Sequence, residues 1–138
     1  MRVGVAAARS HVLAALIVPF MVACGSSSTG PNQGLTAAEL AGTYDLVSIT
    51  FQGSPPLSPP AATGTLTLTL TDYKVTLSLP PDVQEVDSGT YTVSGNQWTQ
   101  SSSVQPVQSV GTAALSHDTL SVNVTTAGMQ VSNVWKKQ

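Results

Sequence analysis

The chain has 138 residues, with five basic and seven acidic side chains and a formal net charge of −2 at pH 7. Only 9% of the residues are charged, and no segment gathers lysine and arginine. This composition excludes a nucleic-acid-binding protein, which needs clustered basic residues to displace counterions from phosphates, and the length suffices for one small domain.

Residues 1–23 have the layout of a secretory signal peptide. Arg2 and Arg9 make the start positive, and the segment from Val12 to Ala23 is uncharged and largely apolar. This segment is shorter than the roughly 20 residues that a membrane-spanning helix needs, and Pro19 interrupts it. We therefore predict that residues 1–23 direct export and are removed.

Cys24 follows this segment directly and is the only cysteine of the chain. The sequence Val22-Ala23-Cys24 resembles the lipobox of bacterial lipoproteins, in which a small residue precedes the cysteine that is lipidated. The resemblance implies that Cys24 is the lipid attachment site and the mature N-terminus. Each buried methylene of an acyl chain contributes about 0.8 kcal/mol, so several chains would hold the protein on a membrane. An ordinary secreted protein with a free thiol is the alternative.

The segment after the cysteine predicts a tether and a short helix. Gly25 follows Cys24 where an aspartate could stand, which by analogy with enterobacterial sorting favours the outer membrane, facing the periplasm. Residues 24–34 have no apolar side chain beyond the cysteine and are predicted as a flexible tether. Thr36 and Glu39 match a capping box, which predicts one or two helical turns that could close the end of a domain.

After the helix the hydrophobic period changes to two, which is typical of strands with one buried face. Residues 43–51 are rich in β-branched and aromatic side chains and predict a first strand. Residues 52–63 contain four prolines and predict a loop, because proline cannot donate to a sheet ladder. Residues 64–71 alternate leucine and threonine, and residues 73–79 continue the alternation after a turn at Thr71-Asp72, so together they predict a hairpin.

Residues 83–88 are predicted as a loop, with Asp82, Glu85 and Asp87 forming an exposed acidic cluster whose spacing matches no calcium-binding loop. Beyond it, alternating patterns and turn residues predict five further strands, at 89–93, 98–104, 107–115, 120–124 and 129–135. The chain is therefore predicted to be all-β, with about eight short strands.

The brief connections between these strands favour one architecture. Successive hairpins produce a meander that closes on itself, whereas a Greek-key sandwich needs long crossings between sheets. An immunoglobulin-like sandwich would also need a Cys…Trp…Cys spacing that one cysteine cannot supply. We predict a small antiparallel up-and-down barrel over residues 35–138, preceded by a short helix.

This arrangement resembles the small lipocalin-like domains of bacterial lipoproteins. The resemblance rests on a short helix, on Gly42-Thr43-Tyr44 at the start of the first strand, and on the eight-strand meander. In that family a basic residue near the last strand packs over the aromatic ring of the Gly-x-Trp or Gly-x-Tyr motif. The resemblance implies this role for Lys136 or Lys137, beside Trp135, and it covers residues 35–138. The strands are short, so side chains could fill the interior.

Catalytic and metal chemistry lacks the necessary residues in this sequence. His117 is the only histidine left after cleavage, and Ser116 and Asp118 beside it are typical of a turn rather than of a triad that converges in space. One histidine and scattered carboxylates give no metal-ligand spacing. We therefore expect no enzymatic activity, no metal site and no cofactor.

Binding is the remaining function. The side chains expected to point inward are Leu66, Leu68, Leu70, Tyr73, Val75, Leu77, Tyr91, Val93, Leu120, Val122 and Met129. The residues expected to line an apolar pocket for a small hydrophobic ligand are Tyr44, Leu68, Tyr73, Tyr91 and Trp98. The first hypothesis is a membrane-anchored envelope lipoprotein that binds such a ligand in the periplasm. The second is a structural or partner-binding lipoprotein that has a filled barrel, takes no ligand and docks another envelope protein.

Overall fold

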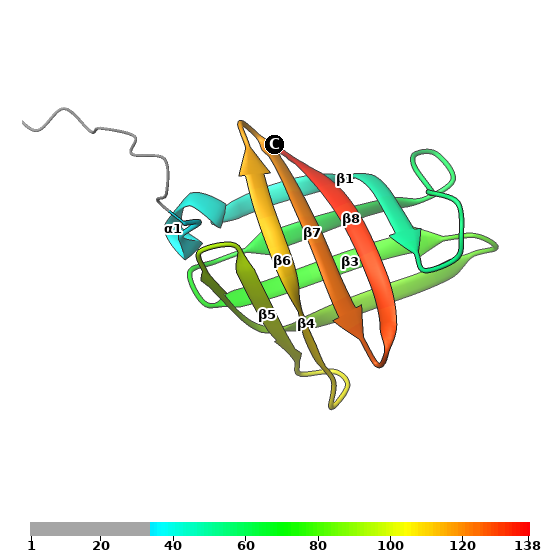
Figure 1. Ribbon diagram of the computed structural model, residues 1–138. Coiled ribbons are helices and arrows are strands. Elements are labelled where there is room, and N and C mark those ends of the chain that lie inside the picture. Colours follow the sequence, from blue (N-terminus) through cyan, green and yellow to red (C-terminus); the bar gives the residue numbers. More distant parts are fainter. Residues whose placement is uncertain (1–33) are drawn as a thin grey trace, which may run out of the picture.

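A computed structural model describes residues 34–138, so the predicted signal peptide, Cys24 and the tether up to residue 33 lie outside the described residues. Among residues 34–138, one short helix precedes eight strands (Figure 1). The elements are α1 (Ala37–Leu40), β1 (Gly42–Phe51), β2 (Thr63–Leu68), β3 (Asp72–Leu79), β4 (Val83–Ser94), β5 (Gln97–Ser102), β6 (Gln108–Ser116), β7 (Thr119–Thr126) and β8 (Met129–Lys137).

The eight strands form a closed antiparallel barrel in which each strand pairs with the next and β8 pairs back with β1. This confirms the predicted all-β class and the meander. Strand β1 closes the barrel by pairing with β8, and this pairing has one register shift, between Leu46 and Ser48. Because the strands described in residues 34–138 close into a barrel around one hydrophobic core, we expect this segment to fold by itself.

Strand register determines which side chains face the interior. Directly opposite residues of an antiparallel pair project to the same face of the sheet. Leu66 lies opposite Tyr44 on one side and Val75 on the other, and Trp135 lies opposite Leu46 and Leu120. These positions form the inner face, and the alternation of the sequence follows the same face along each strand.

Helix α1 closes one end of the barrel. Helix α1 begins with the predicted capping box, since the Thr36 hydroxyl accepts from the Glu39 backbone N–H and the Glu39 carboxylate accepts from the Thr36 N–H. Leu40 of this helix is fully buried, and its carbonyl accepts a 2.7 Å hydrogen bond from the Tyr44 hydroxyl. Leu35 also bridges to Gly95 in the β4–β5 turn, so the chain enters at this closed end (Figure 1).

The turn between β2 and β3 differs from the prediction. Strand β2 ends at Leu68, and the Thr69 hydroxyl accepts a 2.9 Å hydrogen bond from the Asp72 backbone N–H. The turn therefore begins at Thr69 and not at Thr71, because a threonine side chain competes with the ladder for backbone partners. Leu70 lies in this turn and is 62% exposed, so its predicted inward position is wrong.

Within residues 34–138, no helix has both the length and the apolar character required to cross a lipid bilayer.

Candidate functional site

The barrel contains a cavity of about 600 Å³ at the end opposite α1. All eight strands contribute lining residues, together with Gln105 and Val107 from the β5–β6 loop and Ala127 from the β7–β8 turn. Gln105, Ala127 and Met129 are all exposed to solvent, so the cavity reaches the surface between these loops. The interior is thus packed at the α1 end, and the cavity lies toward the other end.

Two tryptophans form part of the apolar lining. Trp98 and Trp135 are each 2% exposed, and they lie among aliphatic side chains of the cavity such as Leu66 and Val122. Buried indole N–H groups need acceptors. The Trp98 Nε1 donates to the Gln100 side-chain oxygen at 2.9 Å.

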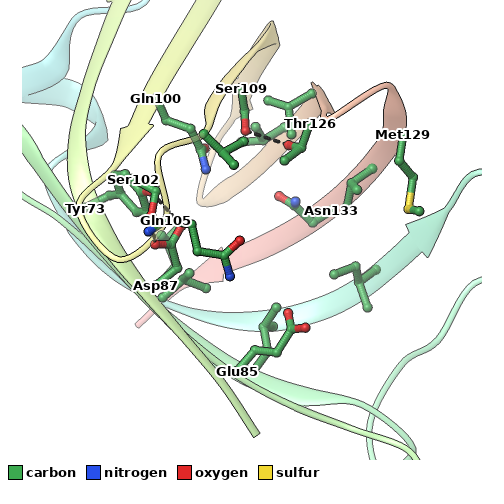
Figure 2. Close-up of a pocket in the computed structure, with 18 of the residues that line it drawn as sticks. Tyr73, Glu85, Asp87, Gln100, Ser102, Gln105, Ser109, Thr126, Met129 and Asn133 are labelled. Carbon is green, nitrogen blue, oxygen red and sulfur yellow. Dashed lines mark hydrogen bonds between the residues drawn. The ribbon is translucent and has the colours of Figure 1, made fainter. Parts of the chain in front are cut away.

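The Trp135 Nε1 likewise donates to the Asn133 side-chain oxygen at 2.6 Å. Since each indole can only donate, these bonds define which end of each amide is the oxygen. The amide N–H₂ groups of Gln100 and Asn133 are therefore the donor ends of these side chains, and Figure 2 shows both side chains around the hollow. Apolar contact surface and directed polar groups therefore occur together, as in ligand pockets.

Two carboxylates also line the cavity, and their position corrects the predicted acidic loop. Residues 83–88 belong to β4, where Glu85 lies opposite Leu77 and Asp87 opposite Val75. Both carboxylates therefore occupy the inner face of the sheet (Figure 2). Glutamate and aspartate are uncommon in strands, but full pairing with β3 outweighs that local preference.

Asp87 is held by a local hydrogen-bond network. The Tyr73 hydroxyl donates to one of its carboxylate oxygens at 2.7 Å. The Ser102 hydroxyl and the Ser88 backbone N–H donate to the other. Burial, and then the neighbouring Asp87 carboxylate, raise the pKa of Tyr73 well above its ordinary value, so this hydroxyl stays protonated and continues to donate. Asp87 is thus positioned by groups from β3, β4 and β5.

The mouth carries further polar groups on the opposite side. Ser109 of β6 is 4% exposed, and its hydroxyl shares a hydrogen bond with the hydroxyl of Thr126 on β7. Gln105 from the β5–β6 loop also lines the cavity, on the side of Asp87 and Ser102 (Figure 2). Polar side chains therefore lie around the cavity mouth as well as beside the two tryptophans.

The five residues expected to form a ligand pocket are divided between the two ends of the barrel. Tyr73 and Trp98 line the cavity. Tyr44, Leu68 and Tyr91 are buried but do not line it.

Tyr44 lies beneath α1, and the Tyr91 ring stacks on Trp98 with ring centroids 4.7 Å apart. The Tyr91 hydroxyl donates to the Thr69 carbonyl in the β2–β3 turn, at 2.7 Å. Burial raises the pKa of both Tyr44 and Tyr91, as expected for hydroxyl groups in a packed interior. Tyr44 was expected to line the pocket, but the helix that precedes it covers the end of the barrel where it lies.

Sequence reasoning missed Glu85, Asp87, Asn133 and Trp135 as cavity residues. The period-two pattern could have identified the first two, because Val83, Glu85, Asp87, Gly89 and Tyr91 continue a single alternation through β4. Asn133 follows the same rule on β8, where it lies opposite the inward residues Ile49 and Val122. Charged and amide side chains at these positions hid the pattern.

His117 and the lipid attachment residue are the other sites considered in the sequence. His117 is exposed in the β6–β7 turn at the closed end, with its Nδ1 3.4 Å from the Ser116 hydroxyl. Among residues 34–138, no three histidine, cysteine or acidic side chains are grouped closely enough to hold a metal ion. Cys24 lies outside the described residues.

The fold and the cavity together define a class: a closed, eight-stranded antiparallel β-barrel with one end sealed by a helix and the other hollow. Among solved structures, a redesigned β-barrel has a TM-score of 0.57 at 15% identity, covering 78% of this chain and 98% of that one. A de novo designed fluorescence-activating β-barrel has a TM-score of 0.52 at 16% identity, covering 74% and 96%. These likenesses show the fold alone. No protein-family model and no curated protein sequence matches the chain.

Proposed function

We propose that this protein is a non-enzymatic binding module for a small hydrophobic ligand, anchored to a bacterial cell envelope through a lipid on Cys24. The observation that supports this proposal is the cavity of about 600 Å³ with a mostly apolar interior. Pockets that bury small ligands typically measure roughly 300–1,000 Å³. A core kept only for stability would be packed without a hollow of this size.

The closed end of the barrel supports the resemblance to lipocalin-like domains, which we include in the proposal. The Lys137 Nζ lies 5.6 Å from the centre of the Tyr44 ring and 3.3 Å from the Glu39 carbonyl oxygen. This is the contact that the resemblance implies between a basic residue near the last strand and the aromatic residue of the first. Lys136 instead pairs with Asp118, at 3.7 Å.

The position of residue 35 in the barrel suggests how the cavity mouth is oriented relative to the lipid anchor. Leu35 lies at the closed end, beside Gly95. A tether of residues 24–34 would therefore join the barrel at the end opposite the mouth. In the proposed arrangement, on an outer membrane facing the periplasm, the mouth would point away from the lipid anchor and remain accessible to ligands.

A second candidate function is docking of another envelope protein at the mouth. Three apolar side chains around it are substantially exposed, namely Val83 at 44%, Val104 at 59% and Met129 at 51%. Exposed apolar groups around a concave surface are also found where proteins associate. The two hypotheses predict different results for the purified protein: a bound ligand adds the mass of a small molecule, whereas a partner co-purifies as a second protein.

Native mass spectrometry of the protein purified from its source cells tests the ligand. We expect a reproducible additional mass of a small molecule that is lost on organic extraction, because an apolar ligand in a cavity survives gentle purification. A polypeptide of unaltered mass in repeated preparations would contradict ligand binding. Co-purification of a stoichiometric protein would then support the second function.

A pair of matched variants locates the additional mass. Val131 lines the cavity and is half-buried, so Val131→Phe would occupy part of the hollow. Val110 is 48% exposed and does not line the cavity, so Val110→Phe adds the same bulk outside it. Overpacking costs about 1–3 kcal/mol, so Val131→Phe should reduce the ligand-bound fraction roughly tenfold while Val110→Phe leaves it unchanged. Equal occupancy in both variants would place the ligand elsewhere.

Radioactive palmitate labelling tests the anchor. Because Cys24 is the only cysteine, no other thiol of the chain competes for the label. We expect Cys24→Ser to abolish labelling and to release the protein from the membrane fraction. Undiminished labelling of this variant would contradict the lipoprotein proposal, and an unlabelled wild-type protein in the medium would support the secreted alternative.

A further inference from the structure

The charged side chains of residues 34–138 that line the cavity are both acidic. Glu85 and Asp87 both line it, whereas the lysines of residues 34–138 lie elsewhere. Lys136 pairs with Asp118, and Lys137 covers Tyr44 at the closed end. Lys74 of β3 is exposed and pairs with Thr67 of β2 and Ser88 of β4, so its side chain projects to the face opposite that of Tyr73 and Val75. The cavity therefore contains two acidic groups and, within the described residues, no basic one.

We propose that the cavity binds an amphipathic cation, with an apolar body against Trp98 and Trp135 and an ammonium group near the carboxylates of Glu85 and Asp87. This inference rests on the proposed function, since it specifies the chemical class of the ligand. It makes the acidic residues of β4 specificity determinants rather than solvated surface groups.

The depth of the two carboxylates supports this pose. Asp87 is partly buried, and its neighbour on the same face, Gly89, is buried beside Tyr73. Glu85 precedes Asp87 by two residues on the same face of β4, so it lies closer to the mouth, and it is exposed. The two side chains therefore form an acidic wall that runs from the entrance toward the interior along β4. An ammonium group entering from solvent would meet Glu85 first and Asp87 further in.

Asp87 retains capacity for a ligand although it is already hydrogen-bonded. An ionised carboxylate offers about four acceptor positions. The Tyr73 hydroxyl, the Ser102 hydroxyl and the Ser88 N–H occupy three of them. These donors hold the carboxylate in place without neutralising its charge. A partly buried carboxylate with three neutral donors and no basic partner is a favourable site for an ammonium group.

The opposite charge is disfavoured by the same groups. A fatty acid or another anionic amphiphile would place its headgroup near two carboxylates, and like charges brought together at a binding site repel one another. The amide N–H₂ groups of Gln100 and Asn133 could donate to an anion, but they carry no charge to offset this repulsion. The faces of Trp98 and Trp135 also attract cations rather than anions.

Binding of three ten-carbon probes to residues 34–138 tests the inference. The probes are decylamine, decanoate and 1-decanol, which share an apolar chain and are cationic, anionic and neutral at pH 7. The two tryptophans of the chain both line the cavity, so their fluorescence reports occupancy directly. We expect decylamine to bind at least about tenfold more tightly than decanoate, with 1-decanol between them.

Variants separate the cavity charges from the overall charge of the protein. Glu85 is exposed on the wall, so Glu85→Gln should fold normally and reduce the preference for decylamine over decanoate by roughly three- to fivefold. Glu85→Gln combined with Asp87→Asn should remove the preference. Asp118→Asn removes an equal charge at the closed end, where Asp118 is also exposed, and should leave the preference unchanged.

The outcomes distinguish this inference from the function on which it rests. Equal affinities for the three probes would overturn the cationic ligand while supporting a hydrophobic one. A preference that decreases equally in Glu85→Gln and Asp118→Asn would also overturn it, because the effect would then come from net charge. Absence of any probe binding, by fluorescence and by calorimetry, would overturn both proposals.

Discussion

Gly111→Ala is expected to lower the free energy of unfolding of residues 34–138 by about 3 kcal/mol or more. Gly111 lies on β6, opposite Trp98 on β5 and Val124 on β7. A Cβ atom at this position would lie 1.8 Å from the Asn123 carbonyl oxygen and 2.7 Å from the Val124 Cα. Both are backbone atoms of β7, so they cannot move aside without separating two paired strands.

This glycine allows the sheet to curl closely enough to close. Gly89 on β4 has the same character, because a Cβ there would lie 1.9 Å from the Ser101 carbonyl oxygen. Each of these glycines lies opposite a large aromatic residue, Trp98 for Gly111 and Tyr73 for Gly89. Glycines at such bends, covered by aromatic side chains, are a recognised means of bending sheets into barrels. The loss in Gly111→Ala should therefore be a failure of closure.

Urea unfolding, followed by circular dichroism, measures the effect, and Gly128→Ala is the control. Gly128 has a φ of +81°, but a Cβ there would meet no atom within 4 Å. Alanine at such a φ costs about 1 kcal/mol from backbone conformation alone. A Gly111→Ala protein no less stable than the Gly128→Ala protein would show that β7 does not restrict this position.

Leu68→Asp is expected to unfold the domain at neutral pH. Leu68 is 3% exposed and lies opposite Gly42 and Tyr73 in the sealed half of the barrel. Removing a buried leucine side chain costs about 2–5 kcal/mol, and burying an unpaired carboxylate costs several more. Together these costs approach the total stability of a typical small domain, which is about 5–15 kcal/mol.

Leu70→Asp provides a matched control within the same repeat. Leu68 and Leu70 are two residues apart and would share one face if the alternation continued. Leu70 instead lies in the β2–β3 turn and is 62% exposed. Thermal melting should show a cooperative transition for Leu70→Asp close to that of wild type and none for Leu68→Asp. Equal stability of the two variants would contradict the described position of the turn.

The all-β class and the strand order could be predicted from local sequence. Alternation with a period of two is a property of one strand, and turn residues such as Gly95 and Asn96 specify that neighbouring strands form hairpins. The capping box at Thr36 is also local, because its three hydrogen bonds join residues only three apart. Such features need no knowledge of distant contacts.

The site was predicted less well than the fold. Tyr73 and Trp98 were predicted to line a pocket and do line the cavity, but the same prediction also named Tyr44, Leu68 and Tyr91, which do not. Inward phase alone does not distinguish a residue that fills the barrel from one that lines its hollow. Position along the barrel axis makes that distinction, and it depends on the register between successive strands.

The two residues of the acidic wall were missed for a related reason. Glu85 and Asp87 have low strand propensity, and the sequence around them is as typical of a loop as of a strand. Their inward direction follows from pairing with Leu77 and Val75 of the neighbouring strand β3, and local sequence does not specify that pairing. Tertiary pairing therefore converts a hydrophilic segment into part of the cavity lining.

By itself, the sequence determined the class, the order of the elements and the phase of most strands, because each depends on interactions between near neighbours along the chain. The tertiary structure decided which end is sealed, where the hollow lies and which polar groups face it. Closing β1 onto β8 sets the register of every strand at once, and residues such as Asp87, Gln100 and Asn133 reach a common space only after closure. Long-range geometry of this kind has no signature within any single segment.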